Sequence, residues 1–257
     1  GRPILGLDCH DLLAITLDAC PEAIYVPAHI WTPHFSLFGA FSGFDTIEEC
    51  YEELTPQVHA LETGLSSDPS MNRRLSALDS FHLISNSDAH SPAKLGREAN
   101  LFDIPMSYDG LYGAIQRGEG LAGTIEFFPE EGKYHFDGHR KCHLCLSPSQ
   151  ARQYNGICPV CGKKLTTGVL HRIEQLADRQ EDFILPGGRP YENLVPLPEV
   201  IAACMGSSSA SVKVTRQYEH MLEELGNEFH ILRSAGLDDI SRIGGQLTAQ
   251  GIRPLRE

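Results

Sequence analysis

The chain has 257 residues, 41% of them hydrophobic and 21% charged, and its 34 acidic and 21 basic residues give a net charge of −13. This length and composition predict one large globular domain, or such a domain with a small appendage, and the overall acidity argues against a polyanionic partner for the chain as a whole. No run of eighteen apolar residues occurs, which excludes a membrane-spanning helix from the sequence prediction.

The first half of the chain alternates helix-like and strand-like segments. This pattern favours an α/β fold with a mostly parallel sheet and crossover helices. A polar, Gly- and Pro-bearing stretch at 178–190 predicts an exposed loop or linker, and the tail predicts three short amphipathic helices at 195–206, 211–226 and 237–247. In chain order, the first half predicts a helix at 8–20, strands at 23–28, 58–62 and 81–85 with a short helix at 46–53 between the first two, a helix start at 91–95, a strand at 99–102, a helix at 107–117 and a strand at 124–128.

Potential metal ligands follow or end three of these predicted strands. His29 follows 23–28, Glu62 ends 58–62, and Asp88 and His90 follow 81–85. The carboxyl ends of parallel strands meet in one crevice, so histidine and carboxylate groups there predict a divalent metal site that takes Zn²⁺, Mg²⁺ or Mn²⁺. Three of these residues also have a structural alternative. His29 fits a core histidine bonded to backbone, Glu62 fits a cap of the turn that follows it, and Asp88 fits the N-cap of a helix that begins at Ser91 and Pro92.

Two Cys-x-x-Cys pairs occur in the run HRKCHLCLSPSQARQYNGICPVCGKK, with twelve residues between them. Four thiolates in this spacing predict a structural Zn²⁺ site formed by Cys142, Cys145, Cys158 and Cys161, with disulfide pairing as the alternative. The other four cysteines lie scattered in apolar segments typical of buried free thiols. This cysteine usage predicts an intracellular, cytoplasmic protein.

Positive charge is concentrated around the predicted zinc site. Between Lys133 and Arg172 the chain carries seven Lys or Arg residues and the single acid Asp137, a net charge of +6. Such a surface is typical of nucleic-acid binding, while the alternative is a solvated surface that offsets the thiolates.

Five long phrases in the sequence resemble a known family. They are PAHIWTPHFSLFG, LETGLSSDPSMN, SNSDAHSPAKLGREAN, GTIEFFPEEGKYHFDGHRKC and NGICPVCGKKLTTGVLHRIEQLADR. Together they are similar to endonuclease Q, a DNA-repair nuclease built on the polymerase-and-histidinol-phosphatase (PHP) fold, and the similarity spans residues 1–205. The resemblance implies the C-terminal half of a seven-stranded PHP-type βα barrel at 1–132, a zinc-ribbon-like module at 133–178 and a helical C-terminal region at 179–257.

The resemblance also implies an activity and the residues that carry it. We expect metal-dependent cleavage of a DNA phosphodiester on the 5′ side of a deaminated base (uracil, hypoxanthine or xanthine) or an abasic site. His29, Asp88 and His90 are the implied catalytic metal ligands, with Glu62 as a further ligand. We expect one aromatic residue, Trp31, to stack on a DNA base. The residues expected to bind DNA phosphates are the basic ones, Arg140, Lys141, Lys163, Lys164 and Lys213.

The sequence departs from the family at its beginning. PHP proteins open with a His-x-His strand and further ligands, and no such strand precedes His29, so we expect the first half of the barrel to be absent and the metal cluster to be incomplete in these residues. The start GRPILGLDCHDLL, which has no initiator Met or signal peptide, likewise predicts a piece of a longer chain. Two alternatives remain: a non-catalytic zinc-ribbon fragment that binds DNA, and a PHP phosphoesterase that acts on a small phosphate ester.

Overall fold

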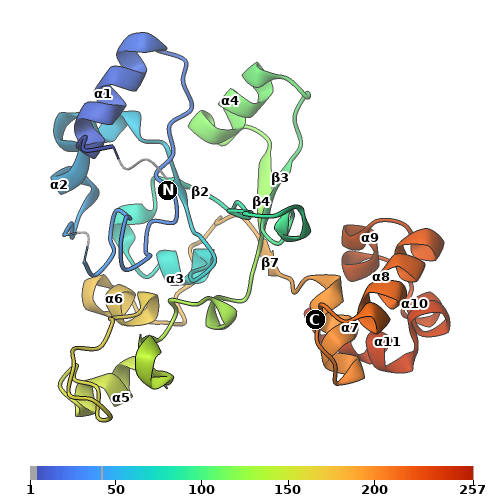
Figure 1. Cartoon of the computed structure of the whole chain (residues 1–257). Coiled ribbons are helices and arrows are strands. Elements are labelled where there is room, and N and C mark those ends of the chain that lie inside the picture. The colour runs from blue at the N-terminus through green and yellow to red at the C-terminus, as the bar shows by residue number, and fades with distance from the viewer. Residues whose placement is uncertain (1–4, 42, 257) are drawn as a thin grey trace. The chain divides into compact units, whose positions relative to one another are not determined.

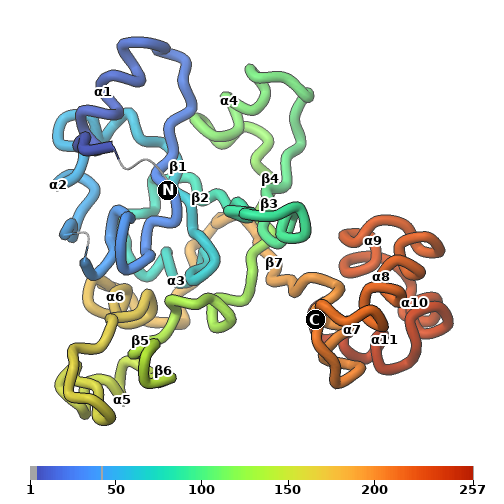
Figure 2. The backbone as a smooth tube through the Cα atoms, in the orientation of Figure 1, coloured from blue at the N-terminus to red at the C-terminus, as the bar shows by residue number. Residues whose placement is uncertain are grey.

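A computed structural model describes residues 5–41 and 43–256. The chain divides into two compact units, Gly1–Glu192 and Asn193–Glu257. Figures 1 and 2 show the elements of each unit in chain order, and they lead from mixed helices and strands in the first to helices alone in the second. The three-part division predicted from the sequence stays a prediction, and residues 1–4, on which the expected internal start partly rests, lie outside the described residues.

The first unit combines helices with short strands. Its α/β character confirms the predicted class, while the barrel stays a prediction. The helices are α1 (Cys9–Ala19), α2 (Ile47–Tyr51), α3 (Pro69–Asn72), α4 (Tyr108–Arg117), α5 (Pro148–Gln153) and α6 (Val169–Leu176), and the strands are β1 (Ala60–Glu62), β2 (His82–Ile84), β3 (Ala99–Phe102), β4 (Leu121–Glu126), β5 (Asp137–His139), β6 (Leu144–Leu146) and β7 (Tyr191–Asn193).

Capping side chains set the helix boundaries that the sequence pattern predicts. The Asp8 carboxylate accepts a hydrogen bond from the His10 amide at 2.9 Å and begins α1. Thr46 and Glu49 form a reciprocal capping box at α2. Ser107 caps α4, which ends at Gly118 in the left-handed conformation, with φ of 73°. The predicted helix start at 91–95 is only a 3₁₀ turn, Pro92–Lys94.

The strands form three small sheets, and their pairing corrects the expected topology. β1 and β2 are parallel, with Ala60 opposite His82, but β3 and β4 are antiparallel, as are β5 and β6. The predicted parallel pairing therefore holds for β1 and β2, and the prediction is wrong for β3 with β4 and for β5 with β6. β7 is the third strand beside β4.

The predicted strand at 23–28 is wrong. The structure assigns no regular strand there, although the Pro27 carbonyl accepts from the Glu62 amide at 3.2 Å and the Ile30 amide donates to the Glu62 carbonyl at 3.2 Å. Pro27 has no N–H to donate to a strand ladder. The chain from Pro27 to Ile30 is therefore joined to the end of β1 by these two backbone hydrogen bonds without forming a regular strand.

The main core of the first unit joins α1, the loop after His29, β1 and α6. Its fully buried side chains include Leu13, Ile30, Trp31, Leu61 and Ile173. The Trp31 ring stacks on Phe38 with centroids 4.9 Å apart. Its indole N–H donates to Asn72 Oδ1 at 2.7 Å, and this bond satisfies the polar group that burial of the ring removes from water.

Beyond Asn193, where β7 ends, the regular structure of the described residues in the second unit is helical. The predicted amphipathic segments correspond to α7, α8 and α10, and their apolar faces bury Ile201, Val214, Met221 and Ile240. A Cβ on Gly244 would lie 2.7 Å from Met221 Sδ, so any larger residue at this position of α10 would require the Met221 side chain of α8 to move. None of the described helices has both the length and the apolar composition that crossing a bilayer requires. The helices are α7 (Leu197–Met205), α8 (Val212–Leu225), α9 (Glu228–Arg233), α10 (Leu237–Gly244) and α11 (Gln246–Ile252).

Replacement of Asn72 tests the polar contact in the core. Asn72 is fully buried, and its amide also donates to Ser67 Oγ at 3.1 Å and to the Asp68 carbonyl at 2.8 Å. We expect Asn72→Ala to lower the free energy of unfolding by about 2–3 kcal/mol, because the Trp31 N–H is left buried without a partner. Trp31 is the single tryptophan, so urea unfolding followed by its fluorescence reports this site directly. The exposed Gln180→Ala variant is the control, and an equal loss in both variants would contradict the assignment.

Candidate functional site

The Glu62 carboxylate at the end of β1 connects the segments that carry the predicted ligands. The side chain is 7% exposed. Its Oε2 accepts a hydrogen bond from the His29 backbone N–H at 2.7 Å, and its Oε1 accepts from the Asn86 side-chain amide at 2.8 Å. One buried carboxylate thus joins the loop of His29 to the loop that leads to Asp88 and His90.

His29 is held in a strained turn beside β1. Its φ is 33°, in the left-handed region that residues other than glycine rarely adopt. A Cβ on Gly64 would lie 2.8 Å from the His29 Cβ, so the glycine is what permits this packing. The imidazole Nδ1 lies 3.1 Å from Thr32 Oγ1. The ring is thereby oriented by its own loop.

Asp88 and His90 lie on the loop after β2 and are open to solvent. Each side chain is 54% exposed, and His90 Nδ1 lies 2.7 Å from the Asp88 carbonyl oxygen and 3.8 Å from Asp88 Oδ1. Asp88 also has a positive φ, 42°, and the Arg97 guanidinium donates to the Ser87 carbonyl at 2.8 Å. Backbone strain of this kind concentrates at functional sites, and here it coincides with two of the predicted ligands, His29 and Asp88.

The described residues form two groups of three or more potential metal ligands whose donor atoms all lie within 4.8 Å of one another, and neither group includes a strand-end ligand. One group is in the zinc module. The other consists of His10, Glu52 and Glu53, three partly or fully exposed side chains. The four strand-end residues His29, Glu62, Asp88 and His90 therefore stay a predicted metal site. Imidazole and carboxylate donors of this kind suit Zn²⁺, Mg²⁺ or Mn²⁺.

Sequence reasoning missed two buried carboxylates beside this site. Glu126 in β4 is fully buried and accepts hydrogen bonds from Thr63 Oγ1 at 2.9 Å and from Thr124 Oγ1 at 2.5 Å. Glu98 is 3% exposed, accepts from the Phe127 amide at 3.4 Å, and leaves its Oε2 without a hydrogen-bond partner. The available signal was Glu126 inside the apolar strand phrase TIEFF, since a carboxylate there must be buried.

Asn100 is a third missed residue, because nothing in the sequence around it indicates a role. From β3 it accepts from the Ser85 amide at 2.9 Å and donates to the Ser85 carbonyl at 2.8 Å. Its amide also donates to Asn86 Oδ1 at 3.2 Å. The Asn100 side chain thus makes the two backbone hydrogen bonds with Ser85 that a neighbouring strand would make at the end of β2. It also positions Asn86, which donates to Glu62.

Burial changes the protonation of the missed carboxylates. The pKa of Glu98 is raised to about 9, mainly by desolvation and to a smaller extent by repulsion from Glu126. Desolvation also raises the pKa of Glu126 to about 7, although the hydrogen bonds that this carboxylate accepts favour its charged form. A raised carboxyl pKa means that the folded state holds a proton that the unfolded state releases. The contribution to stability is complete below the ordinary carboxyl pKa of 4.5 and is lost as pH rises through the folded values.

We therefore expect the free energy of unfolding to fall between about pH 5 and pH 9. Glu98→Gln keeps the shape of the side chain but cannot ionise, so it should flatten this dependence and raise stability most at the alkaline end. Urea unfolding at a series of pH values measures both effects. The exposed Glu48→Gln variant should reproduce the wild-type slope, and an unchanged slope in Glu98→Gln would refute the assignment.

The zinc module is built from the β5–β6 hairpin, α5 and the Cys158–Cys161 turn. A His and three Cys, His139, Cys142, Cys158 and Cys161, place their donor atoms within 4.8 Å of one another. Cys145 is exposed and lies outside this group, so the structure brings together three of the four predicted cysteines. This donor set fits a metal ion. Asp137 fastens the module to α6, because its carboxylate accepts from the Gly168 amide at 2.5 Å and lies 2.6 Å from His171 Nδ1.

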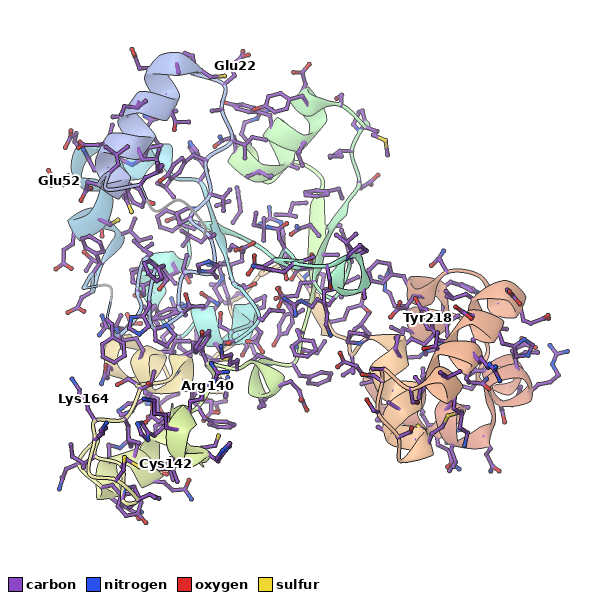
Figure 3. The ribbon with its side chains drawn as sticks, viewed as in Figure 1. Glu22, Glu52, Arg140, Cys142, Lys164 and Tyr218 are labelled. Atoms are coloured by element: carbon purple, nitrogen blue, oxygen red, sulfur yellow. The ribbon has the colours of Figure 1, made fainter. Side chains whose placement is uncertain are left out.

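The predicted phosphate-binding residues are exposed on the same module. Arg140, Lys141, Lys163 and Lys164 are all open to solvent, and Figure 3 shows Arg140 and Lys164 in the region of Cys142. The Lys164 ammonium lies 5.7 Å from the centroid of the Phe41 ring, which links the module to the loop after His29. Lys213 is exposed on α8 of the second unit.

The predicted DNA contact of Trp31 is contradicted by its burial. The ring is 1% exposed and its N–H is bonded inside the core, so it cannot stack on a base. Phe35 and Phe41 of the same loop are 78% and 42% exposed, and Phe41 stacks on His34 at 4.8 Å. Spacing alone could not separate the buried ring from the exposed ones.

A cavity of about 320 Å³ lies elsewhere in the first unit. Its lining includes Arg73, Leu83, Thr124, Phe183, Arg189 and Tyr191, and none of the predicted metal ligands. The cavity is mostly apolar with two guanidinium groups, so it lacks the donors of a metal centre.

The comparisons with known proteins place this geometry in a family context. Residues 196–257 match the family model described as the MJ0043 C-terminal domain. The chain is 32% identical over 253 residues to the uncharacterized protein MJ0043 of Methanocaldococcus jannaschii, covering 93% of this chain and 31% of that protein. It is 28% identical over 230 residues to the uncharacterized protein YqxK of Bacillus subtilis, covering 88% of this chain and 54% of the relative.

Two solved structures share both sequence and fold with the chain. The lesion-specific endonuclease PfuEndoQ from Pyrococcus furiosus matches with a TM-score of 0.85 at 29% identity, over 99% of this chain and 62% of that one. Endonuclease Q in complex with a 27-mer duplex that carries an abasic lesion at the active site matches with a TM-score of 0.86 at 29% identity, over 98% and 63%. The chain therefore shares its α/β fold with these endonuclease Q structures. In sequence and structure the chain is a relative of endonuclease Q, as the sequence phrases predict, and it spans less than two thirds of the length of these relatives.

Proposed function

We propose that the protein is an endonuclease of damaged DNA that hydrolyses the phosphodiester on the 5′ side of a deaminated base or an abasic site. The observation that carries this proposal is the match, over nearly the whole chain, to an enzyme whose structure holds duplex DNA with an abasic lesion at its active site. The match extends through the strand-end loops, the zinc module and the helical unit, so it includes each part to which we assign a role.

The strand-end residues support the hydrolytic part of the proposal. His29, Asp88 and His90 offer imidazole and carboxylate donors, and Glu62 holds their two loops together through the His29 N–H and Asn86. Bound divalent ions would supply an activated water and neutralise charge on the phosphoryl group. The exposure of Asp88 and His90 leaves these two side chains accessible to a phosphodiester.

The zinc module supports the choice of DNA as the substrate. A chain with a net charge of −13 concentrates +6 between residues 133 and 172, and the four exposed cations there face solvent. A small phosphate ester needs no extended cationic surface, whereas a duplex presents a row of phosphates that such residues bind without reading sequence. This argues against the small-molecule phosphoesterase. The non-catalytic DNA-binding alternative predicts the same surface and must be separated by experiment.

Cleavage of defined duplexes tests the catalytic proposal. The native protein, expressed from its gene and supplied with Mg²⁺, Mn²⁺ or Zn²⁺, should cut duplexes that contain uracil, hypoxanthine, xanthine or an abasic site on the 5′ side of the lesion, and should leave undamaged duplex intact. Asp88→Asn and His90→Gln should reduce cleavage to background, because each removes a metal ligand, while binding persists. Exposed residues of the same types give matched controls, Asp103→Asn and His220→Gln.

Each alternative has its own outcome in this experiment. Lesion-independent binding without cleavage would contradict the nuclease proposal in favour of a DNA-binding protein. Hydrolysis of a phosphomonoester with no cleavage of any duplex would contradict it in favour of the small-molecule phosphoesterase.

The salt dependence of binding tests the role of the basic module. Replacing Lys163 and Lys164 by Ala should weaken binding to damaged and undamaged duplex alike and lower the slope of log K against log salt by about 2, since each phosphate contact contributes about one unit. The double variant Arg117→Ala, Arg253→Ala removes the same charge from other exposed positions. Fluorescence anisotropy at several salt concentrations gives the slopes, and equal slopes in the two double variants would refute the assignment.

A further inference from the structure

We propose that the module holds Zn²⁺ through His139, Cys142, Cys158 and Cys161, and that Cys145 stays a free, solvent-exposed thiol. This ligand set replaces the four-cysteine site that the Cys-x-x-Cys spacing predicts. It does not depend on the proposed nuclease activity, because it concerns only the local structure of the β5–β6 hairpin and the Cys158–Cys161 turn.

The pairing of β5 with β6 places His139 and Cys145 on opposite faces of the hairpin. His139 pairs with Leu144 and Gly138 pairs with Cys145. Paired residues of an antiparallel ladder share a face and successive residues alternate, so His139 lies on the face of Leu144 and Leu146, and Cys145 lies on the other. Leu144 and Leu146 pack in the small core that contains Cys142 and Cys158. The imidazole therefore faces the sulfurs, and the Cys145 thiol faces away.

The distances agree with this assignment. His139 Nδ1 lies 3.5 Å from Cys161 Sγ. With Zn–N of about 2.0–2.1 Å and Zn–S of about 2.3 Å, two ligands of one tetrahedral ion are separated by about 3.6 Å. The donor atoms of His139, Cys142, Cys158 and Cys161 all lie within 4.8 Å of one another. Cys145 is not part of this group.

The backbone on the other side of the site is already shaped as a metal knuckle. The Cys158 amide donates to the Lys163 carbonyl at 2.7 Å across the Cys158–Cys161 turn. The turn closes through the Gly162 amide, which donates to the Cys158 carbonyl at 2.9 Å, and Gly162 has a φ of 71° that suits glycine. This turn aims both of its sulfurs at one point. The remaining ligands must come from the hairpin side, where His139 and Cys142 are the residues that face it.

The sequence is compatible with this set once the histidine is included. His139-x-x-Cys142 has the same spacing as the Cys-x-x-Cys pairs, and three cysteines with one histidine form a common structural zinc site. A neutral imidazole in place of a thiolate makes the ligand shell one charge unit less negative. The basic surface around it is correspondingly less offset, which suits a module that binds phosphates.

Metal affinity and thiol reactivity of the full chain test the ligand set. In competition with a chromophoric chelator, Cys145→Ser should bind one Zn²⁺ with wild-type affinity. His139→Ala should lose at least about tenfold in affinity, because loss of a residue that only hydrogen-bonds to a metal ligand already costs about that much, and loss of the ligand itself should cost no less. With Co²⁺ as the spectroscopic probe, Cys145→Ser should leave the sulfur-to-metal charge-transfer band unchanged. His139→Cys should raise its intensity by about a third, since a fourth thiolate joins three.

Alkylation of the wild-type chain gives an independent reading that needs no variant. Iodoacetamide should label Cys145 in the zinc-loaded protein, and should label Cys142, Cys158 and Cys161 only after chelation, as mapped by peptide mass spectrometry. The exposed Cys20 is the internal control for labelling in both states. Protection of Cys145 by zinc, or a loss of affinity in Cys145→Ser with none in His139→Ala, would overturn the proposal.

Discussion

The two hydrogen bonds of the buried Glu62 carboxylate are the interaction on which the candidate site depends. They hold the His29 backbone and the Asn86 amide, and so fix two loops that are far apart in the sequence. A carboxylate withdrawn from water needs such donors, and the donors in turn need a carboxylate in this position. The strain at His29 and Asp88 persists because this network and the core below it determine the backbone of both loops.

The buried carboxylates Glu98 and Glu126 extend this polar interior away from the exposed ligands. Burial withdraws Glu98 and Glu126 from water, and this desolvation raises the pKa of both carboxyls, with repulsion from Glu126 as a further cause at Glu98. Asn100 and the two threonines satisfy most of the remaining polar groups around them. The region is therefore a connected polar network under the loops, and a change in one member should affect the position of the others.

The zinc module follows a different principle, since its structure is determined by local sequence. Its hairpin, its turn and its ligands come from one stretch of chain, and Asp137 attaches it to the helix that follows. Sequence spacing located this site and three of its four donors. The pleat of the hairpin selected His139 in preference to Cys145, because a strand presents alternate residues to opposite faces.

The sequence by itself determined the α/β class, the helices α1, α2, α4, α7, α8 and α10, the location of the cysteine-rich module and the resemblance to endonuclease Q, since local periodicity, capping residues and long phrases express these directly. Tertiary structure alone decided which side chains meet. The antiparallel pairing of β3 with β4, the burial of Trp31 and the roles of Glu98, Glu126 and Asn100 arise from contacts between distant segments. Packing decides such contacts, and no local pattern records whether an aromatic ring or a carboxylate faces solvent or the interior.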